Sequence, residues 1–379
     1  MSLFREDAPG RPNASARRHP RRLLVGWAML AIGVVVIGVL AVLRAPYAIE
    51  GPGPVWNTIG TTDEQSAGTA TASTDAKPLI SISGAKTYKT SGSLDMLTVS
   101  VRGTPDNLPS WAEVISAWFT KSDSVVPIQE LYPENATSTQ IDEENEAEMT
   151  SSQQDAVAAA LTHLGRSYTS TVEVAAVTAG SPATGKLEKG DTIESVNGTA
   201  ISDYDQLHTA IAKSKGAAPL RIVVDRKGTE HTYSMTATKS SASGWIIGIG
   251  ISPDYTFPLK VSYGLSSVGG PSAGMMFSLG IIDKLTPGSL TGGADIAGTG
   301  TITADGTVGA IGGIVQKMYA AKSAGATIFL APKSNCTDVA GHIPSGLTVY
   351  SVATLDQSVT AVDTIADGGD TSALPTCGS

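Results

Sequence analysis

The run Gly269-Gly270-Pro271-Ser272-Ala273-Gly274-Met275 opens an apolar stretch that continues to Ile282, and the rest of the chain is interpreted around it. Glycine and alanine surround the Ser272 hydroxyl with small side chains, so a substrate backbone could approach it closely. The apolar residues that follow predict a helix that begins at the serine. A helix N-terminus carries free N–H groups, which suit an oxyanion formed during acyl transfer. The stretch predicts a nucleophile loop made of Gly270, Pro271, Ser272, Ala273 and Gly274.

Lys317 lies on a second predicted helix, Gly313 to Ser323, and is the base that we pair with Ser272. A serine hydroxyl is a weak nucleophile until a base takes its proton, and a lysine accepts a proton only as a neutral amine. Burial lowers a lysine pKa because it disfavours the charged form. A lone helical lysine is usually solvated, so the assignment rests on the two segments together. They predict a Ser272–Lys317 dyad.

The pattern Gly270-x-Ser272-x-Gly274 also satisfies the nucleophile elbow of α/β-hydrolases. That fold requires an acid and then a histidine further along the chain. The order is met by His342 after any of three acids, Asp283, Asp305 and Asp338. His342 lies in a loop-like stretch, however, and no large sheet is evident before the serine. We therefore prefer the dyad to a Ser-His-acid triad.

Residues 245–366 resemble the proteolytic domain of Lon proteases. The resemblance rests on Gly270-Pro271-Ser272-Ala273-Gly274, Thr299-Gly300, Val308 to Gly313, and Lys317. It implies that Ser272 is the nucleophile, that Lys317 is the base, and that Thr299 contacts the lysine amine. Two positions depart from the family pattern, since Gly269 and Thr301 stand where Lon proteases often carry acidic residues. These changes concern how the reactivity of the dyad is adjusted, and not which residues form it.

A second segment, residues 168–239, resembles a bacterial PDZ domain. The resemblance rests on Ser181-Pro182-Ala183, Gly190-Asp191-Thr192-Ile193 and Val196-Asn197-Gly198. The Asn-Gly pair is a strong hairpin signal, and strand-like runs surround it. PDZ domains bind an extended peptide as an added strand, often by its C-terminus. The resemblance therefore implies that this segment recognises peptides.

The stretch Gly180 to Lys186 fits the pattern Gly-x4-Gly-Lys of a phosphate-binding loop. Such a loop requires Ser or Thr next, where Leu187 stands, and Pro182 removes one N–H from the loop backbone. We therefore expect no bound nucleotide. Ordinary Lon proteases carry an ATPase, whereas no phosphate-loop motif remains in this sequence. We therefore expect this chain to cleave without ATP.

Residues 23–43 contain no charge and are long enough to cross a bilayer as a helix. The six arginines that precede them include Arg11, Arg17, Arg18, Arg21 and Arg22. After Arg44 the next basic residue is Lys77. The positive-inside rule then places residues 1–22 in the cytoplasm and the rest outside it. A cleaved signal peptide is the alternative, because Arg21-Arg22 hints at a leader and Ala45-x-x-Ala48 is a weak cleavage site. We expect an uncleaved, single-pass anchor in the cell membrane.

Composition argues against several other classes of protein. The net charge of −9 and the lack of a basic stripe argue against nucleic-acid binding. No cysteine or histidine spacing fits zinc, so we expect no metal and no cofactor. The only two cysteines are Cys336 and Cys377. Outside the cytoplasm an even number of cysteines favours a disulfide, which would pin residues 367–379 to the catalytic domain.

These segments together predict an α+β multidomain protein. We expect a cytoplasmic tail (1–22), a transmembrane helix (23–43), a linker (44–78), an accessory α/β module (79–167), the PDZ-like domain (168–239), the Lon-type proteolytic domain (245–366) and a C-terminal tail (367–379). This order resembles membrane-anchored bacterial PDZ–Lon proteins. It implies a Ser-Lys endopeptidase that acts on extracytoplasmic peptides or unfolded segments. A catalytically silent PDZ/Lon-like binding scaffold is the alternative, and the sequence leaves the substrate and any homo-oligomer open.

Overall fold

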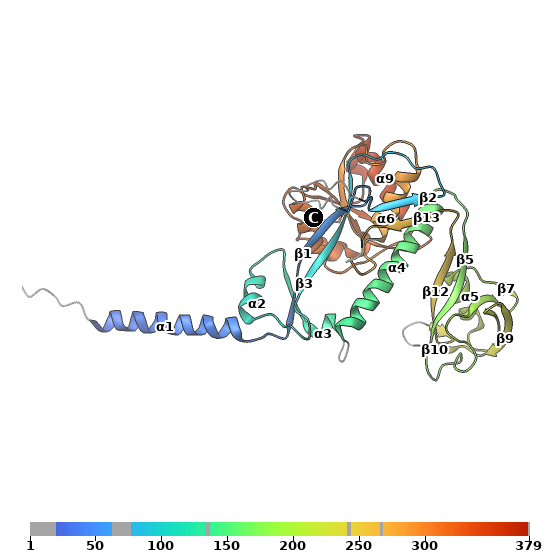
Figure 1. Cartoon of the computed structure of the whole chain (residues 1–379), viewed down its shortest axis with the longest axis horizontal. Coiled ribbons are helices and arrows are strands. Elements are labelled where there is room, and N and C mark those ends of the chain that lie inside the picture. Colours follow the sequence, from blue (N-terminus) through green and yellow to red (C-terminus); the bar gives the residue numbers. More distant parts are fainter. Residues whose placement is uncertain (1–19, 63–76, 133–136, 241–243, 266–267, 378–379) are drawn as a thin grey trace, which may run out of the picture.

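The computed structural model describes residues 20–62, 77–132, 137–240, 244–265 and 268–377 (Figure 1). Helix α1 (Pro20–Val42) projects away from the remainder of the protein. Its segment Leu24–Val42 has a mean hydropathy of 2.6 and is 0% buried. By length and composition the helix is a candidate membrane span. Most of the expected cytoplasmic tail and residues 63–76 of the expected linker lie outside the described residues.

Helix α2 (Trp111–Trp118) lies beside the end of α1 and begins with a capping box between Ser110 and Glu113. The Trp111 N–H donates to the Leu43 carbonyl at 3.0 Å, and the Ala45 N–H donates to the Pro109 carbonyl at 2.8 Å. These bonds connect the exit of α1 to the folded part of the chain.

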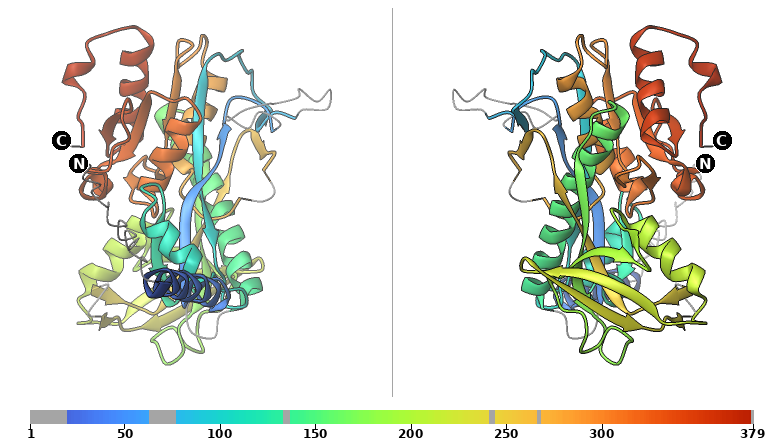
Figure 2. Two further views of the ribbon diagram at one scale, coloured as in Figure 1. Left: turned by 90° about the vertical axis from the view of Figure 1, so that its left-hand side faces the viewer. Right: turned by 90° about the vertical axis from the view of Figure 1, so that its right-hand side faces the viewer.

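A six-stranded sheet forms the centre of the main lobe. Its order is β18 (Thr348–Val352), β17 (Ile328–Pro332), β14 (Asp295–Gly298), β3 (Ser93–Arg102), β1 (Tyr47–Asn57) and β4 (Ser124–Pro127). Strands β3, β14, β17 and β18 are parallel, whereas β1 is antiparallel to both β3 and β4. Figure 2 shows the long strands β1 and β3 in the middle of the main lobe, with the C-terminal segments in red to one side.

Helices cover both faces of this sheet. Leu94, Met96 and Ile296 face the cluster that contains α4 (Ser138–His163), α6 (Gly274–Leu285) and α9 (Leu355–Ala366). Leu97 and Ala297 face the cluster that contains α7 (Ile314–Ser323) and α8 (Cys336–Val339). The alternation along each strand is the period of two expected for a sheet that is buried on both faces. Shorter elements complete the lobe: β2 (Ile80–Ser83), β13 (Lys260–Tyr263), α3 (Ile128–Leu131), η1 (Lys333–Asn335), η2 (Thr371–Ala373) and the hairpin β15 (Thr301–Ile302) and β16 (Val308–Gly309).

This arrangement differs from the expected linker over residues 44–78 and the separate module over residues 79–167. Strand β1 lies within the expected linker, yet it is an inner strand of the sheet. Strand β3 pairs directly with β14 of the expected proteolytic domain, from Ser93 opposite Asp295 to Met96 opposite Gly298. The segments before and after the small lobe therefore form one α/β unit, and its apolar core requires both of them.

The apolar residues between 152 and 164 predict a helix there, and helix α4 extends it toward the N-terminus. It begins after a capping box between Thr137 and Gln140. Its first half carries five acidic residues: Asp142, Glu143, Glu144, Glu146 and Glu148. The second half is the buried one, with Ala156, Ala160 and Leu161 in the core. The first half is polar and carries no apolar stripe, so its sequence pattern does not predict a helix.

The small lobe, residues 169–256, is joined to the main lobe through two strands that lie side by side (Figure 1). Its sheet order is β12 (Ile249–Thr256), β5 (Thr169–Val177), β6 (Thr192–Val196), β8 (Leu220–Arg226) and β9 (Thr229–Met235), with β7 (Thr199–Ala200) on β6. Helix α5 (Tyr204–Ser214) and the pair β10 (Thr238–Ser240) and β11 (Gly244–Ile246) complete it. Strands β11 and β12 were expected in the proteolytic domain from residue 245 onward. Their pairing places them in the small lobe.

The Asp191 carboxylate links the Gly-Asp motif of the small lobe to the end of β8. It is fully buried and accepts two hydrogen bonds from the Arg226 guanidinium, at 2.6 and 2.8 Å, and one from the Glu188 N–H at 2.8 Å. These bonds lower the pKa of Asp191 against the opposing effect of burial. The Gly190-Asp191 motif, which contributes to the PDZ resemblance, thus has a structural role, because it holds the turn at Glu188 against Arg226 at the end of β8.

The two cysteines are joined, and Cys336 at the start of α8 holds Cys377 near β18. The C-terminal segment follows β18 through a hydrogen bond from the Ser351 N–H to the Pro375 carbonyl at 2.8 Å. The α+β class predicted from the sequence is confirmed.

We predict that reduction of the Cys336–Cys377 bond lowers the free energy of unfolding by about 2–4 kcal/mol, because the bond closes a long loop in the unfolded chain. Denaturant unfolding with and without a reductant measures this difference. A Cys336→Ser/Cys377→Ser variant is the control and should not respond to the reductant. Equal unfolding midpoints for the reduced and oxidised protein would contradict the prediction.

Candidate active site

Ser272 lies in the loop immediately before α6, and neighbouring elements hold this loop in place. The Ser272 carbonyl accepts hydrogen bonds from the Gly300 N–H and from the Thr299 hydroxyl, each at 2.9 Å. The Pro271 carbonyl accepts a bond from the Ser152 hydroxyl of α4 at 2.9 Å. The loop is therefore tied to the residues that follow β14 on one side and to α4 on the other.

The glycines around Ser272 allow the close packing that these bonds require. A Cβ atom on Gly274 would lie 2.7 Å from Cγ2 of Ile302 and 2.8 Å from Oγ of Ser152. A Cβ atom on Gly269 would lie 2.6 Å from Cβ of Asn145 on α4. An acidic side chain at position 269 would collide with α4, which gives a steric reason for this departure from the Lon pattern.

Lys317 lies in the first turn of α7, and its side chain is 2% exposed. Its Nζ lies 2.6 Å from Oγ of Ser272 and 3.1 Å from Oγ1 of Thr299. Three elements supply these groups: the loop before α6, the end of β14 and helix α7. The structure brings together the three residues singled out in the sequence.

Burial lowers the pKa of Lys317 from its ordinary value of 10.5 to about 7. The Thr299 hydroxyl donates its hydrogen to the Ser272 carbonyl, so its oxygen accepts a hydrogen bond from the Lys317 amine. This arrangement orients the amine. In its neutral form the nitrogen can present its lone pair to the Ser272 hydroxyl, which is the geometry that a general base needs.

Backbone donors lie next to the Ser272 hydroxyl. Among the described residues, the N–H groups of Ser272 and Ala273 have no hydrogen-bond acceptor. They stand at the N-terminus of α6, where the helix dipole favours negative charge. Such donors can stabilise an oxyanion that forms on a carbonyl attacked by Ser272.

We predict that kcat/KM rises with pH through the titration of Lys317 near pH 7, since only the neutral amine accepts the serine proton. In Thr299→Val the charged amine loses an acceptor, so the pKa of Lys317 should fall further and the rising limb should move to lower pH. The maximal rate should fall as well, because the amine is less well oriented. A flat pH–rate profile from about pH 5 to 9 would contradict a lysine base.

The residues of the two competing motifs lie elsewhere. His342 is exposed, and its backbone N–H donates to the Val339 carbonyl. Lys186 lies in the small lobe, where its Nζ donates to the Ser234 carbonyl at 2.8 Å. Sequence reasoning missed Ser152 and Asn145, which position the nucleophile loop from α4. No local signal could have identified them, because the contact spans more than a hundred residues.

A cavity of about 1040 Å³ lies between the two lobes. From the small lobe it is lined by Ser202, Asp203, Tyr204, Gln206 and the β12 residues Ile251, Pro253 and Tyr255. From the main lobe it is lined by Asp155 and Thr162 of α4, Tyr168, and the tip of the β15–β16 hairpin, Thr303, Ala304, Asp305 and Thr307.

Two family profiles match the sequence. The profile of the Lon protease C-terminal proteolytic domain matches residues 230–363, and the profile of the PDZ domain matches residues 146–236. Lon protease 1 of Bacillus subtilis strain 168 is 30% identical over 182 residues, which are 46% of this chain and 23% of that protein. Lon protease 1 of Sorangium cellulosum strain So ce56 is 38% identical over 93 residues, which are 24% of this chain and 11% of that protein. The chain thus matches about a quarter or less of the length of these relatives.

Two solved structures are similar over part of the chain. The PDZ domain of the SdrC-like protein from Listeria monocytogenes has 22% sequence identity and a TM-score of 0.20, and the match covers 21% of this chain and 85% of that one. The second domain of a Listeria protein, solved in solution, has 24% identity and a TM-score of 0.20, and the match covers 22% and 83% of the two chains.

Proposed function

Because the chain carries a Lon-type proteolytic domain and a PDZ domain, we propose that it is a serine endopeptidase with a Ser272–Lys317 dyad. The observation that carries this proposal is the contact between the two groups, 2.6 Å from Nζ to Oγ, made by an amine that is buried and has a pKa of about 7. A solvated lysine would be protonated at neutral pH and could not accept the serine proton.

The reaction proceeds through an acyl-enzyme. The neutral Lys317 amine takes the hydroxyl proton as Oγ of Ser272 attacks the scissile carbonyl carbon. The oxyanion is stabilised by backbone N–H groups at the start of α6. Collapse of this intermediate breaks the C–N bond, and Lys317 returns its proton to the leaving amine. Water then attacks the acyl-enzyme with Lys317 again as the base, which releases the new carboxylate and restores Ser272.

We propose that cleavage is independent of ATP and acts on extracytoplasmic peptides or unfolded protein segments. The supporting observation is that the one stretch resembling a phosphate loop lies in the small lobe, where Lys186 donates to a backbone carbonyl. Without an unfolding motor the site would accept only chain that is already extended. Folded substrates with flexible tails would therefore be cut in those tails.

We further propose that α1 anchors the enzyme in a membrane. The apolar segment Leu24–Val42 is exposed along its length, and the arginines before it favour a cytoplasmic N-terminus. The Cys336–Cys377 bond fits an oxidising compartment on the other side. Protease protection in sealed membrane vesicles of known orientation tests this topology, because an exposed catalytic domain on the cytoplasmic face would overturn it.

Labelling with a fluorophosphonate probe tests the peptidase proposal and separates it from a catalytically silent scaffold. We expect the wild-type protein to be labelled on Ser272, as located by mass spectrometry of its peptides, and to hydrolyse unstructured peptides. Ser272→Ala should lose both properties. A folded wild-type protein that bound peptides but neither cleaved them nor reacted with the probe would support the scaffold instead.

We predict that excising the small lobe raises the KM for long substrates far more than for short ones. The two backbone ends of the lobe are adjacent, because Thr169 pairs with Thr256, so a short Gly-Ser linker can join Tyr168 to Phe257. Long substrates would lose a second binding segment, whereas short peptides would not. Steady-state kinetics on a matched pair of substrates measures the difference, and equal losses on both would indicate a structural role.

A further inference from the structure

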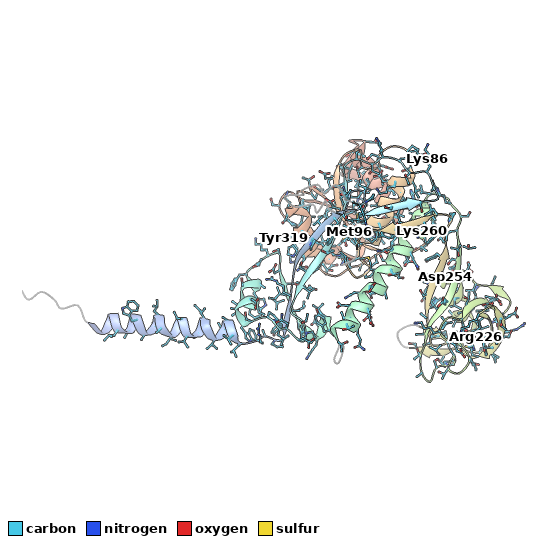
Figure 3. The ribbon with its side chains drawn as sticks, in the orientation of Figure 1. Lys86, Met96, Arg226, Asp254, Lys260 and Tyr319 are labelled. Atoms are coloured by element: carbon cyan, nitrogen blue, oxygen red, sulfur yellow. A yellow bond between two sulfur atoms is a disulfide. The ribbon has the colours of Figure 1, made fainter. Side chains whose placement is uncertain are left out.

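Strand β12 forms the free edge of the small-lobe sheet, because its only partner in that sheet is β5 among the described residues. Ile251, Pro253 and Tyr255 project from it into the cavity between the lobes, opposite the first turn of α5. In Figure 3, Asp254 marks β12 on the bridge between the two lobes. An exposed edge beside a helix can accept one more extended strand.

The turn before β12 suits the end of such a strand. Ile247 and Gly248 turn their carbonyls inward, where these accept hydrogen bonds from Ala183 and Thr178. Their N–H groups have no acceptor among the described residues. Gly248 has a φ of +78°, and successive free N–H groups in such a turn can bind a carboxylate. Trp245 packs against Gly216, just beyond the C-terminal end of α5.

The opposite end of β12 lies next to helix α4 and the β15–β16 hairpin of the main lobe. Beside Tyr255 the cavity is lined by the tip of the β15–β16 hairpin and by Asp155, whose carboxylate accepts a hydrogen bond from the Tyr255 hydroxyl at 2.9 Å. That hairpin starts next to Gly300, whose N–H donates to the Ser272 carbonyl. On the other wall, Asp155 lies one helical turn from Ser152, which holds the Pro271 carbonyl. The main-lobe lining of the cavity therefore belongs to elements that also contact the nucleophile loop.

We propose that the enzyme measures its cleavage position from the free C-terminus of the substrate, an inference that rests on the proposed peptidase activity. The substrate carboxylate binds at Ile247 and Gly248, and its tail pairs antiparallel with β12, because only that direction carries the upstream chain toward the main lobe. The upstream chain passes through the cavity to Ser272. Strand β12 has eight residues, so the scissile bond lies more than eight residues before the C-terminus.

A series of tailed substrates tests this measurement. Each substrate is a folded protein followed by an unstructured tail of one repeated residue pattern, and the tails are shortened one residue at a time from the C-terminus. We expect mass spectrometry to show a C-terminal product of constant length across the series. A cleavage site that keeps its distance from the folded protein, or that is scattered along the tail, would overturn the proposal. No cleavage of any unstructured peptide would instead overturn the peptidase function.

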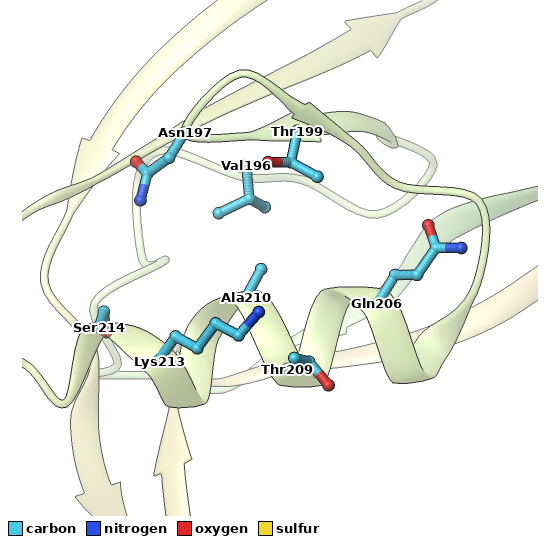
Figure 4. A pocket seen from close by; sticks show the side chains of 8 residues that line it. All are labelled: Val196, Asn197, Thr199, Gln206, Thr209, Ala210, Lys213 and Ser214. Atoms are coloured by element: carbon cyan, nitrogen blue, oxygen red, sulfur yellow. The ribbon is translucent and has the colours of Figure 1, made fainter.

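Blocking the carboxylate and the cavity provides two further readouts. Amidation of the tail C-terminus should raise the KM by about tenfold or more, because the free N–H groups lose their anion. Ser202→Trp, which fills the cavity from its exposed rim, should lower kcat/KM for tailed substrates by a similar factor. The matched control is Thr209→Trp at a different cavity, which lies between α5 and the turn from β6 to β7 (Figure 4). Equal rates for the amidated and free tails, or equal losses in the two tryptophan variants, would contradict the proposed path.

Discussion

Ser272→Ala and Lys317→Ala are each expected to lower kcat for peptide hydrolysis by at least about a thousandfold, which is the largest effect that we predict for any substitution in this chain. Ser272→Ala removes the atom that forms the acyl-enzyme. Lys317→Ala removes the base that lies 2.6 Å from this atom, and a serine without its base remains a protonated, weak nucleophile.

The double variant should be little worse than either single variant. Two residues that act as one unit lose their function together, so the second substitution removes nothing that is still active. Lys322→Ala, on the same helix but partly exposed, is the control and should keep the wild-type rate. Single-turnover kinetics on one fluorogenic peptide compares the four variants with the wild-type protein, with circular dichroism to verify folding. Losses that multiply in the double variant, or full activity in Lys317→Ala, would refute the dyad.

The sequence was sufficient to single out Ser272 and Lys317 as a candidate site, because the chemistry limits which residues can form one. A serine between small residues at the start of an apolar helix has few structural explanations, and the matching lysine follows in the next glycine-flanked helix. The structure brings Ser272, Thr299 and Lys317 within hydrogen-bonding distance, as the resemblance to Lon proteases implied. The pKa of Lys317 could not be read from the sequence, since burial is set by elements far along the chain.

The full extent of each lobe could not be predicted, because strand pairing across an insertion leaves no local signal. Strand β1 contains Gly51-Pro52-Gly53-Pro54, a composition typical of loops, and yet its neighbours in the sheet cover it. The packing requires glycine at position 53, since a Cβ atom there would lie 2.4 Å from Oγ1 of Thr98 on β3. Strand β12 was assigned to the proteolytic domain by its position in the chain. Only its register with β5 shows that it forms the edge of the small lobe.

Lys317→Met is expected to stabilise the protein at neutral pH by about 3 kcal/mol while it abolishes catalysis. The pKa of Lys317 is about 7 in the folded state and has its ordinary value of 10.5 in the unfolded state. Between these values the unfolded chain binds a proton that the folded chain does not, so stability is reduced there and rises with pH. Methionine fills a similar space without a charge, although it leaves the Ser272 and Thr299 hydroxyls with one partner fewer, which offsets part of the gain.

The pH dependence identifies the cause of the stabilisation. Below pH 7 the penalty of the buried amine is complete, because both states of the wild-type protein bind the proton, and the gain from methionine should be constant and largest there. As the pH rises from 7 toward 10.5 the wild-type protein should recover stability, and the difference between the two proteins should shrink. Urea unfolding at several pH values measures this, with Lys322→Met as the control for losing a lysine from the same helix. If Lys317→Met were no more stable than the wild type at pH 7, or if its advantage did not shrink on the alkaline side, Lys317 would not be a base whose pKa is lowered by burial.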